Sequence, residues 1–265
     1  MAYDLGIIGG GNMAEAIVRG LLNSKTIPAE KIIVTDISSA RREVFSQMGV
    51  RAVQDNASVA GNSYTVLLCV KPQQMAPALA SLGPVSDSGA LIISIAAGVR
   101  IKSIRGESAL RVIRAMPNTP MLVGQGATAI CAGPLVTSID MSNARRIFES
   151  AGIVIETTED KMDAVTALSG SGPAYFFYLV EQLIKVGIEL GLPPDQAKLL
   201  ACKTAMGSAK MLMESTEEPA ELRRRVTSPG GTTEAAISHL NSAGWPAAMV
   251  EAVKAAAKRS GELSR

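Results

Sequence analysis

The feature that most constrains the fold of this chain is a cluster of three glycines directly after its first apolar run. Residues 5–8 are apolar, residues 9–14 read Gly-Gly-Gly-Asn-Met-Ala, and residues 12–23 have a helical pattern. This order of strand, G-x-G-x-x-[GA] loop and helix is typical of a dinucleotide-binding unit. In such a unit Gly9 permits the tight turn, Gly11 lets the backbone approach the pyrophosphate, and Ala14 allows close helix–strand packing. The helix N-terminus supplies oriented N–H groups to the anion.

Short apolar runs alternate with helical patterns along the first 160 residues. Strands are predicted over residues 5–8, 31–35, 64–70, 90–95, 110–115 and 127–131, and helices over residues 12–23 and 40–48. The strands are rich in Val, Ile and Leu with little alternation, which is typical of a parallel sheet covered on both faces. We therefore expect residues 1–160 to form an α/β Rossmann domain with a doubly wound, mostly parallel sheet that binds a dinucleotide.

Residues 161–265 show helical patterns punctuated by Gly and Pro, and no strand pattern. The stretch 174–190 is apolar around most of its circumference. Gly191 is expected to cap this helix, and Pro193-Pro194-Asp195 suits the first turn of the next one. A helix without a polar face must be surrounded, and one small domain does this poorly. We expect an all-α domain over residues 161–265 that forms a homodimer through its helices.

Composition excludes several classes of function. The 26 Lys and Arg nearly balance the 24 Asp and Glu, and the longest run of like charge is at residues 223–225. We read that run as a solvated helix face and expect no nucleic-acid partner. The single histidine, His239, excludes a Ser-His-Asp triad in practice and any site with two His ligands. The three cysteines are far apart, so neither a disulfide framework nor a metal site is expected.

Nothing in the sequence indicates a membrane or an export signal. No stretch reaches the ~18 consecutive apolar residues of a membrane helix, and the first residues lack a basic region followed by an apolar stretch. We expect a reduced, cytoplasmic setting.

Thr35 and Asp36 close the second predicted strand and are assigned to the cofactor site. An acidic residue about 20 residues beyond the glycine loop takes the ribose 2′-hydroxyl of NAD, and its carboxylate repels a 2′-phosphate. Ser38, Ser39 and the two arginines at 41 and 42 lie just downstream, where such residues could instead hold that phosphate. The pattern favours NADH and leaves NADPH open.

Three further turns follow predicted strands. They read Val-Lys-Pro-Gln at residues 70–73, Ser-Ile-Ala-Ala-Gly-Val at 94–99 and Met-Pro-Asn-Thr-Pro at 116–120. The carboxyl ends of parallel strands meet at one edge of a sheet, so we expect these turns to build a crevice there.

Two stretches of the sequence, one of them near the C-terminus, indicate the function more specifically. Residues 226–237 read VTSPGGTTEAAI and residues 167–175 read ALSGSGPAY. With the motifs above, they resemble the pyrroline-5-carboxylate reductase family over essentially the whole chain, and the Ser-Pro-Gly-Gly-x-Thr stretch is the most distinctive part. The resemblance implies NAD(P)H-dependent reduction of Δ1-pyrroline-5-carboxylate to proline, by a Rossmann domain and a helical dimerisation domain often assembled as a ring of dimers, a decamer.

The resemblance also implies roles for individual positions. The pyrophosphate would lie against Gly9, Gly11, Asn12, Met13 and Ala14, and the adenosine ribose near Asn56. The nicotinamide side would be lined by Val70, Lys71, Pro72, Ala96, Ala97 and Gly98. The substrate would be held by Ser228, Pro229, Gly230, Gly231, Thr232 and Thr233, with Thr233 near the ring nitrogen. Asp36 departs from the small or phosphate-binding residues that many members have there, which bears on the family's common use of NADPH.

The residues suit this chemistry. The segment at 229–231 leads into a predicted helix, so its backbone N–H groups and the helix dipole favour a substrate carboxylate. Hydride attacks the imine carbon, and a protonated imine is already electrophilic, so no strong acid–base residue is needed. The protein's task is then orientation. Thr233 is the candidate catalytic residue, as a hydrogen-bond partner of the nitrogen.

Two other functions fit the same layout. A β-hydroxyacid dehydrogenase uses a lysine on a helix of its second domain, but residues 170–180 contain none. A dinucleotide-binding regulator without catalytic activity would share the fold, but would have no need of the stretch at 228–233.

Overall fold

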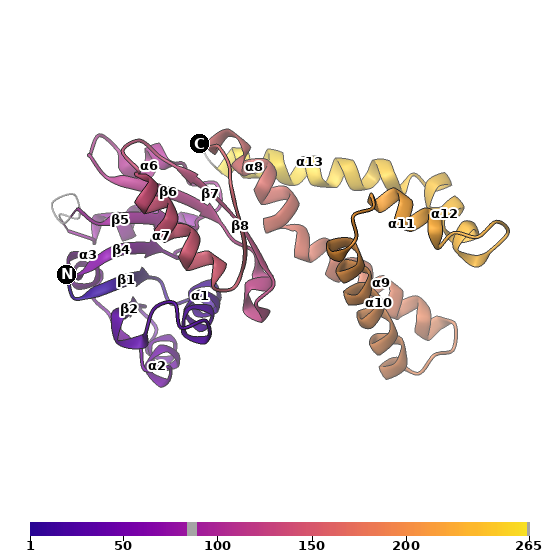
Figure 1. Ribbon diagram of the computed structural model, residues 1–265, viewed down its shortest axis with the longest axis horizontal. Helices are drawn as coiled ribbons and strands as arrows, with labels where there is room; N and C mark the ends of the chain where they lie inside the picture. Colours follow the sequence, from indigo (N-terminus) through magenta and orange to yellow (C-terminus); the bar gives the residue numbers. More distant parts are fainter. Residues whose placement is uncertain (84–88, 264–265) are drawn as a thin grey trace. The chain divides into compact units, whose positions relative to one another are not determined.

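The apolar runs of the first half of the chain form one eight-stranded sheet in the computed structural model, which describes residues 1–83 and 89–263. The strands are β1 (Tyr3–Ile8), β2 (Ile32–Thr35), β3 (Arg51–Val53), β4 (Ser63–Leu68), β5 (Leu91–Ser94), β6 (Arg111–Met116), β7 (Gly126–Ala132) and β8 (Gly152–Glu156) (Figure 1). They lie in the order β3-β2-β1-β4-β5-β6-β7-β8, and every neighbouring pair is parallel except β6 and β7. The predicted α/β fold with a doubly wound, mostly parallel sheet is confirmed.

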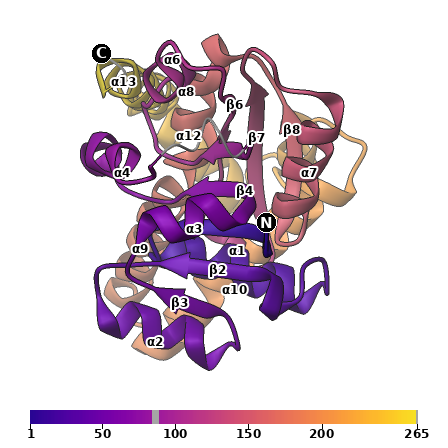
Figure 2. The ribbon, with the colours of Figure 1, turned by 90° about the vertical axis from the view of Figure 1, so that its left-hand side faces the viewer.

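Helices cover both faces of the sheet because successive strand residues point to opposite sides. One face packs against α1 (Asn12–Asn23), α2 (Ser39–Gln47) and α7 (Ser138–Glu149), and the other against α3 (Asn56–Asn62), α4 (Met75–Ala80), α6 (Ile101–Arg105) and α8 (Met162–Val165). Thus Ile7 joins the first apolar core and its neighbour Ile8 the second. Figure 2 shows α3 beside β4, one of the strands that it contacts.

Two strands were not predicted from the sequence. β3 has only three residues, and its Arg51 is exposed. β8 lies at the edge of the sheet, where Val154 is buried but Ile153 and Ile155 are exposed. Neither strand has the continuous apolar run that identifies a strand covered on both faces.

The chain divides into two compact units, Met1–Ser171 with Ala256–Arg265 (unit 1) and Gly172–Ala255 (unit 2). The boundary expected at 160/161 lies before this division. The reason is that η4 (Glu159–Lys161), α8 and the π-helical turn η5 (Thr166–Gly170) still pack on the sheet, with Met162 fully buried in the second apolar core. The short helices η1 (Ala29–Lys31), η2 (Pro72–Gln74) and η3 (Thr119–Val123) also belong to unit 1.

Unit 2 consists of helices joined by turns and loops. It contains α9 (Gly172–Glu189), α10 (Pro194–Glu214), α11 (Pro219–Arg225), α12 (Thr232–Ser242) and the first part of α13 (Trp245–Leu263). Gly191 follows α9 with φ +96°, and its N–H donates to Ile188 O at 2.9 Å, which confirms the predicted cap. α10 begins at Pro194, as expected.

The apolar helix predicted over residues 174–190 is α9, and it is largely uncovered in a single chain. Phe176, Phe177 and Tyr178 have 65, 69 and 66% of their surfaces exposed. Only Gly172 and Gly187 are buried along the helix. Such an exposed aromatic surface is typical of an interface with another chain. In the part of the chain that the structure describes, no helix is long and apolar enough to span a membrane.

Candidate active site

The glycine-rich loop joins β1 to α1 at the carboxyl edge of the sheet. Gly9 has φ +97°, and its N–H donates to Thr35 O at 2.9 Å, so the turn is tied to the end of β2. A Cβ atom on Gly9 would lie 3.0 Å from the carbonyl oxygen of Cys69, which leaves no room for a side chain. A Cβ on Gly11 would meet no atom within 4 Å, because this residue faces open space. Gly11 is therefore the glycine that leaves room for a ligand.

Asp36 binds the glycine loop directly. Its Oδ2 accepts a hydrogen bond from Gly10 N at 2.8 Å, and its Oδ1 accepts one from Ser38 N at 2.8 Å. The carboxylate thereby joins the loop after β1 to the turn after β2.

Both arginines downstream of Asp36 are engaged with the protein. Arg41 donates through Nε to Gly10 O at 2.6 Å and through Nη2 to Glu15 Oε2 at 2.8 Å. The hydrogen bond from Arg41 is the main cause of a lowered pKa of Glu15. Arg42 donates through Nη1 to Asp36 O at 2.7 Å. The alternative role of these arginines, as holders of a phosphate, would require them to leave these partners.

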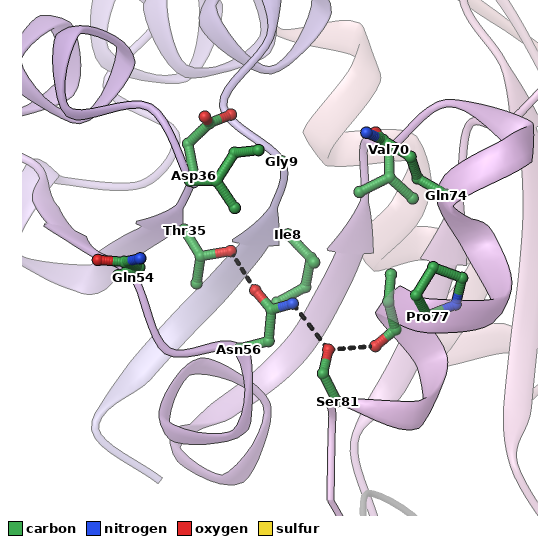
Figure 3. Close-up of a pocket in the computed structure, with 12 residues that line it drawn as sticks. Ile8, Gly9, Thr35, Asp36, Gln54, Asn56, Val70, Gln74, Pro77 and Ser81 are labelled. Carbon is green, nitrogen blue, oxygen red and sulfur yellow. Dashed lines mark hydrogen bonds between the residues drawn. The ribbon is translucent and has the colours of Figure 1, made fainter.

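A first cleft of about 250 Å³ opens beside the ends of β1 and β2. Its wall is braced by hydrogen bonds from Thr35 Oγ1 to Asn56 Oδ1 at 2.5 Å and from Asn56 Nδ2 to Ser81 Oγ at 2.8 Å (Figure 3). The cleft is lined by Ile8, Gly9, Thr35, Asp36, Ile37, Gln54, Asn56, Val70, Gln74, Pro77, Ala78 and Ser81. Asp36 is the one charged residue in this set.

A second cleft of about 560 Å³ lies on the other side of the glycine loop, at the ends of β4, β5 and β6. It is lined by Gly11, Asn12, Met13, Cys69, Val70, Lys71, Pro72, Ile95, Ala96, Ala97, Met116, Pro117, Asn118, Thr119 and Gly170. Lys71 is the one charged residue in this lining. The three turns that the sequence predicts at a common edge therefore do meet in one crevice.

The floor of the second cleft is fixed by Asn118. Its Oδ1 accepts a hydrogen bond from Ala127 N at 2.9 Å, and its Nδ2 donates to Ser169 O at 3.3 Å. Ser169 lies in the π-helical turn η5, a rare geometry that occurs often at functional sites. The bond joins the Met-Pro-Asn-Thr-Pro turn to the motif at 167–175.

Most residues assigned to the cofactor from the sequence line one of the two clefts. Ala14 and Gly98 line neither: Ala14 is fully buried under the sheet, and Gly98 contacts the end of α13. The sequence did not identify Gln54, Gln74 or Ser81, because no motif marks them. Gln54 follows β3, which was not predicted, Gln74 ends η2, and Ser81 follows α4. Asn118 was not assigned to the cofactor either, although the sequence places it in a turn directly after a predicted strand.

The residues assigned to the substrate lie at the start of α12 in unit 2. Gly231 is the N-cap and Gly230 has φ +70°, a backbone conformation that favours glycine. Gly230 N donates to Glu234 Oε2 at 2.7 Å, and Gly231 N donates to Ser228 O at 3.0 Å. These two donors, expected to be open to a ligand, thus have partners within the segment.

The N–H groups at 232 and 233 begin α12. The first N–H groups of a helix have no acceptor inside it. They point outward at the positive end of the helix dipole, where an anion is stabilised. Thr232 and Thr233 are therefore the donors of this segment that suit a carboxylate.

Metal and thiol chemistry find no support in the structure. Among the described residues, no group of three or more His, Cys, Asp or Glu is placed to hold a metal ion. The three cysteines are free thiols. Burial raises the pKa of Cys131 to about 11 and that of Cys69 further, so neither is a reactive thiolate near neutral pH.

Comparison with known proteins gives two family matches. Residues 159–263 match the model described as pyrroline-5-carboxylate reductase dimerisation. Residues 4–98 match the model described as NADP oxidoreductase, coenzyme F420-dependent. The first match covers the helical part of the chain, and the second covers β1 to β5 of the sheet.

Whole-length relatives give the same result. A pyrroline-5-carboxylate reductase of Synechocystis sp. is 45% identical over 267 residues, covering 100% of both chains. The structure of such a reductase from Coxiella burnetii is 39% identical with a TM-score of 0.90 and full coverage of both chains. That of the Plasmodium falciparum enzyme, with NADP bound, is 30% identical with a TM-score of 0.90 and covers 99% of this chain and 98% of that one.

Proposed function

This chain belongs to the pyrroline-5-carboxylate reductase family, and from that premise we propose that it reduces Δ1-pyrroline-5-carboxylate to L-proline with NADH or NADPH, the last step of proline biosynthesis. The observation that carries the proposal is the pair of clefts beside the glycine loop, together with an intact Ser228–Thr233 segment in a chain that matches its relatives from end to end.

The cofactor is proposed to span the glycine loop. Gly11 and the N-terminus of α1 suit the pyrophosphate, since Gly11 faces open space and α1 begins at Asn12. The first cleft suits the adenosine, with Asn56 and Asp36 as its polar groups. The second cleft suits the nicotinamide, between Val70-Lys71-Pro72 and Ala96-Ala97. Unit 1 is then the dinucleotide-binding part and unit 2 the substrate-binding part.

We propose that NADH is preferred. The lining of the first cleft carries a carboxylate and, among its described residues, neither Lys nor Arg. Arg41 is held by Glu15, and Arg42 by the carbonyl of Asp36. A 2′-phosphate would meet the charge of Asp36 without a ready cation. NADP bound to the P. falciparum relative makes NADPH the competing cofactor.

The substrate carboxylate is proposed to bind at the start of α12. Thr232 and Thr233 offer N–H groups there, and a Cβ on Gly230 would be strained at its φ of +70°. A reduced nicotinamide bound in the second cleft would supply hydride to the carbon of the protonated imine, whose C=N electron pair would move to nitrogen and give the amine. Thr233 is proposed to hold that nitrogen in place by a hydrogen bond while it becomes an amine.

The dimerisation model that the helical part matches supports a homodimer, and the exposed aromatic residues of α9 supply a surface for it. We propose further that dimers assemble into a ring, a decamer. The three free thiols support a reducing, cytoplasmic setting.

The runner-up is a β-hydroxyacid dehydrogenase. α9 provides no lysine between residues 172 and 180, where that chemistry needs one. This absence disfavours proton abstraction from an alcohol, and family membership favours imine reduction.

The test of the reaction is isotopic. The protein is incubated with Δ1-pyrroline-5-carboxylate and a reduced cofactor that carries deuterium at both C4 positions of the nicotinamide, and the product is analysed by NMR. The proposal expects proline with deuterium on the methylene carbon next to nitrogen. Proline without deuterium, or no proline from a folded protein that binds cofactor, contradicts it.

A further inference from the structure

The last turn of α13 contacts the loop that lines the second cleft. Gly98 follows Ala96 and Ala97 in this loop and has φ +75°. A Cβ atom on Gly98 would lie 2.8 Å from the Cβ of Leu263 and 3.2 Å from its carbonyl carbon. Only glycine combines that backbone conformation with so close an approach. The contact lies within unit 1, to which residues 256–265 belong.

A partly buried hydrogen bond joins the same turn to α8. Ser260 is 3% exposed and is the one residue of α13 that is buried. Its Oγ donates to Asp163 Oδ1 at 2.7 Å. The space beside Gly261 is also filled by this carboxylate, since a Cβ there would lie 3.5 Å from Asp163 Oδ2.

The other end of the loop is held by a second carboxylate. Ile101 begins α6 directly after the loop, and its N–H donates to Glu159 Oε1 at 2.7 Å. Both carboxylates face one guanidinium: Arg114 Nη1 lies 3.7 Å from Glu159 Oε1, and Nη2 lies 3.8 Å from Asp163 Oδ1. Arg114 is 3% exposed, whereas Glu159 and Asp163 are 34 and 29% exposed, so water screens these attractions in part.

The end of α13 is not part of the core of the sheet. Among the described residues, neither apolar core cluster contains a member from residues 256–263. Its contacts include Gly98 and Asp163. Loss of these contacts should therefore disturb the loop more than it disturbs the stability of the fold.

We propose that the last turn of α13 positions the nicotinamide, by bracing the Ala96–Gly98 loop from behind through Leu263 and the Ser260–Asp163 bond. Ser260 and Asp163 are then positioning residues, remote from the reacting atoms. The inference rests on the proposed function in one respect, that the second cleft holds the nicotinamide.

Two ligands test the proposal by binding alone, without turnover. NADH occupies both clefts, whereas ADP-ribose lacks the nicotinamide. Ser260→Ala is expected to raise the dissociation constant of NADH about fivefold to tenfold, ~1–1.4 kcal/mol, and to leave that of ADP-ribose unchanged. Ser142→Ala, on an exposed position of α7, is the matched control and should change neither. Equal weakening of both ligands by Ser260→Ala, or no change in either, overturns the proposal.

A second pair of variants tests the packing contact. Gly98→Ala is expected to weaken NADH binding more than Ser260→Ala does. Its added Cβ would clash with Leu263, and alanine is strained at the positive φ of this position. Leu263→Gly, made in the otherwise unchanged chain, removes the side chain that faces Gly98 and should also raise the dissociation constant of NADH while leaving that of ADP-ribose unchanged. If Leu263→Gly changes the affinity for neither ligand, the contact does not position the loop. Because these are binding measurements, they remain decisive even if the protein fails to reduce Δ1-pyrroline-5-carboxylate.

Discussion

The carboxylate of Asp36 accepts a hydrogen bond from the backbone N–H of Gly10, with 2.8 Å between Oδ2 and nitrogen. One side chain thus sets the charge of the first cleft and holds the glycine loop between the two clefts. A substitution of Asp36 can therefore change both the proposed cofactor preference and the geometry of the glycine loop. Only a substitution that changes one of the two shows which role matters.

Asp36→Asn makes that separation. The amide oxygen can still accept from Gly10 N, and the negative charge is removed, while the hydrogen bond from Ser38 N is lost because the amide NH2 cannot accept one. We expect the ratio of kcat/KM for NADPH to that for NADH to rise about tenfold, ~1.4 kcal/mol, as repulsion of the 2′-phosphate is lost. Asp36→Ala, which also removes the bond to the loop, should lower kcat/KM with both cofactors. An unchanged ratio in Asp36→Asn would show that this charge does not select the cofactor.

Gly11 and Gly9 should respond differently to alanine. Gly11 has φ −74° and open space around its Cβ position, so Gly11→Ala is expected to fold normally and to weaken cofactor binding at least tenfold, about 1.4 kcal/mol, by occupying the pyrophosphate site. Gly9 has φ +97° and a crowded Cβ position, so Gly9→Ala should lower Tm. Thermal unfolding and cofactor titration distinguish the two. A Gly11→Ala protein that binds cofactor normally would place the pyrophosphate elsewhere.

The sequence predicted the sheet well because its strands are buried on both faces. Runs such as residues 64–70 carry little except apolar residues, and turns follow them at the carboxyl edge. β3 and β8 were not predicted because their exposed residues break that apolar pattern. The compact units divide after residue 171 and not at 160, because the helical turns at residues 159–171 pack on the sheet, whereas the matched dimerisation model begins at residue 159. Periodicity in the sequence does not reveal on which unit such a turn packs.

The residues of the candidate site also fall into those that the sequence identified and those that it did not. Motif residues such as Gly9 and Lys71 were identified because each lies in a turn that follows a strand. Ser81 and Gln54 were not, since no motif marks them where they follow α4 and the unpredicted β3. Contacts between distant segments, such as Gly98 with Leu263, leave no mark in a single sequence.

Thr233 should affect turnover and not cofactor binding. Removing its hydroxyl in Thr233→Ala is expected to lower kcat about tenfold to a hundredfold. This corresponds to an activation free energy raised by about 1.4–2.7 kcal/mol, through lost orientation and hydrogen bonding. The dissociation constant of NADH should stay unchanged. Thr233→Ser keeps the hydroxyl and should recover most of the rate, and Thr216→Ala, exposed outside the segment, serves as a control. Steady-state kinetics equal to the parent protein would remove Thr233 from the mechanism.

The dimer should depend on the aromatic surface of α9. Phe177→Asp places a charge where a partner helix would have to bury it. We expect the dimer dissociation constant to rise at least a hundredfold, about 2.7 kcal/mol. Light scattering during size-exclusion chromatography measures the mass directly. A Phe177→Asp protein that stays dimeric at low concentration would show that the interface lies on another surface.

The central claim is tested most directly by following the absorbance of the reduced nicotinamide with Δ1-pyrroline-5-carboxylate, in parallel with NADH and with NADPH. We expect rapid loss of absorbance that depends on the imino acid, with the larger kcat/KM for NADH. No loss with either cofactor, from a folded protein that binds both, would contradict the assignment as a reductase and favour a dinucleotide-binding regulator instead.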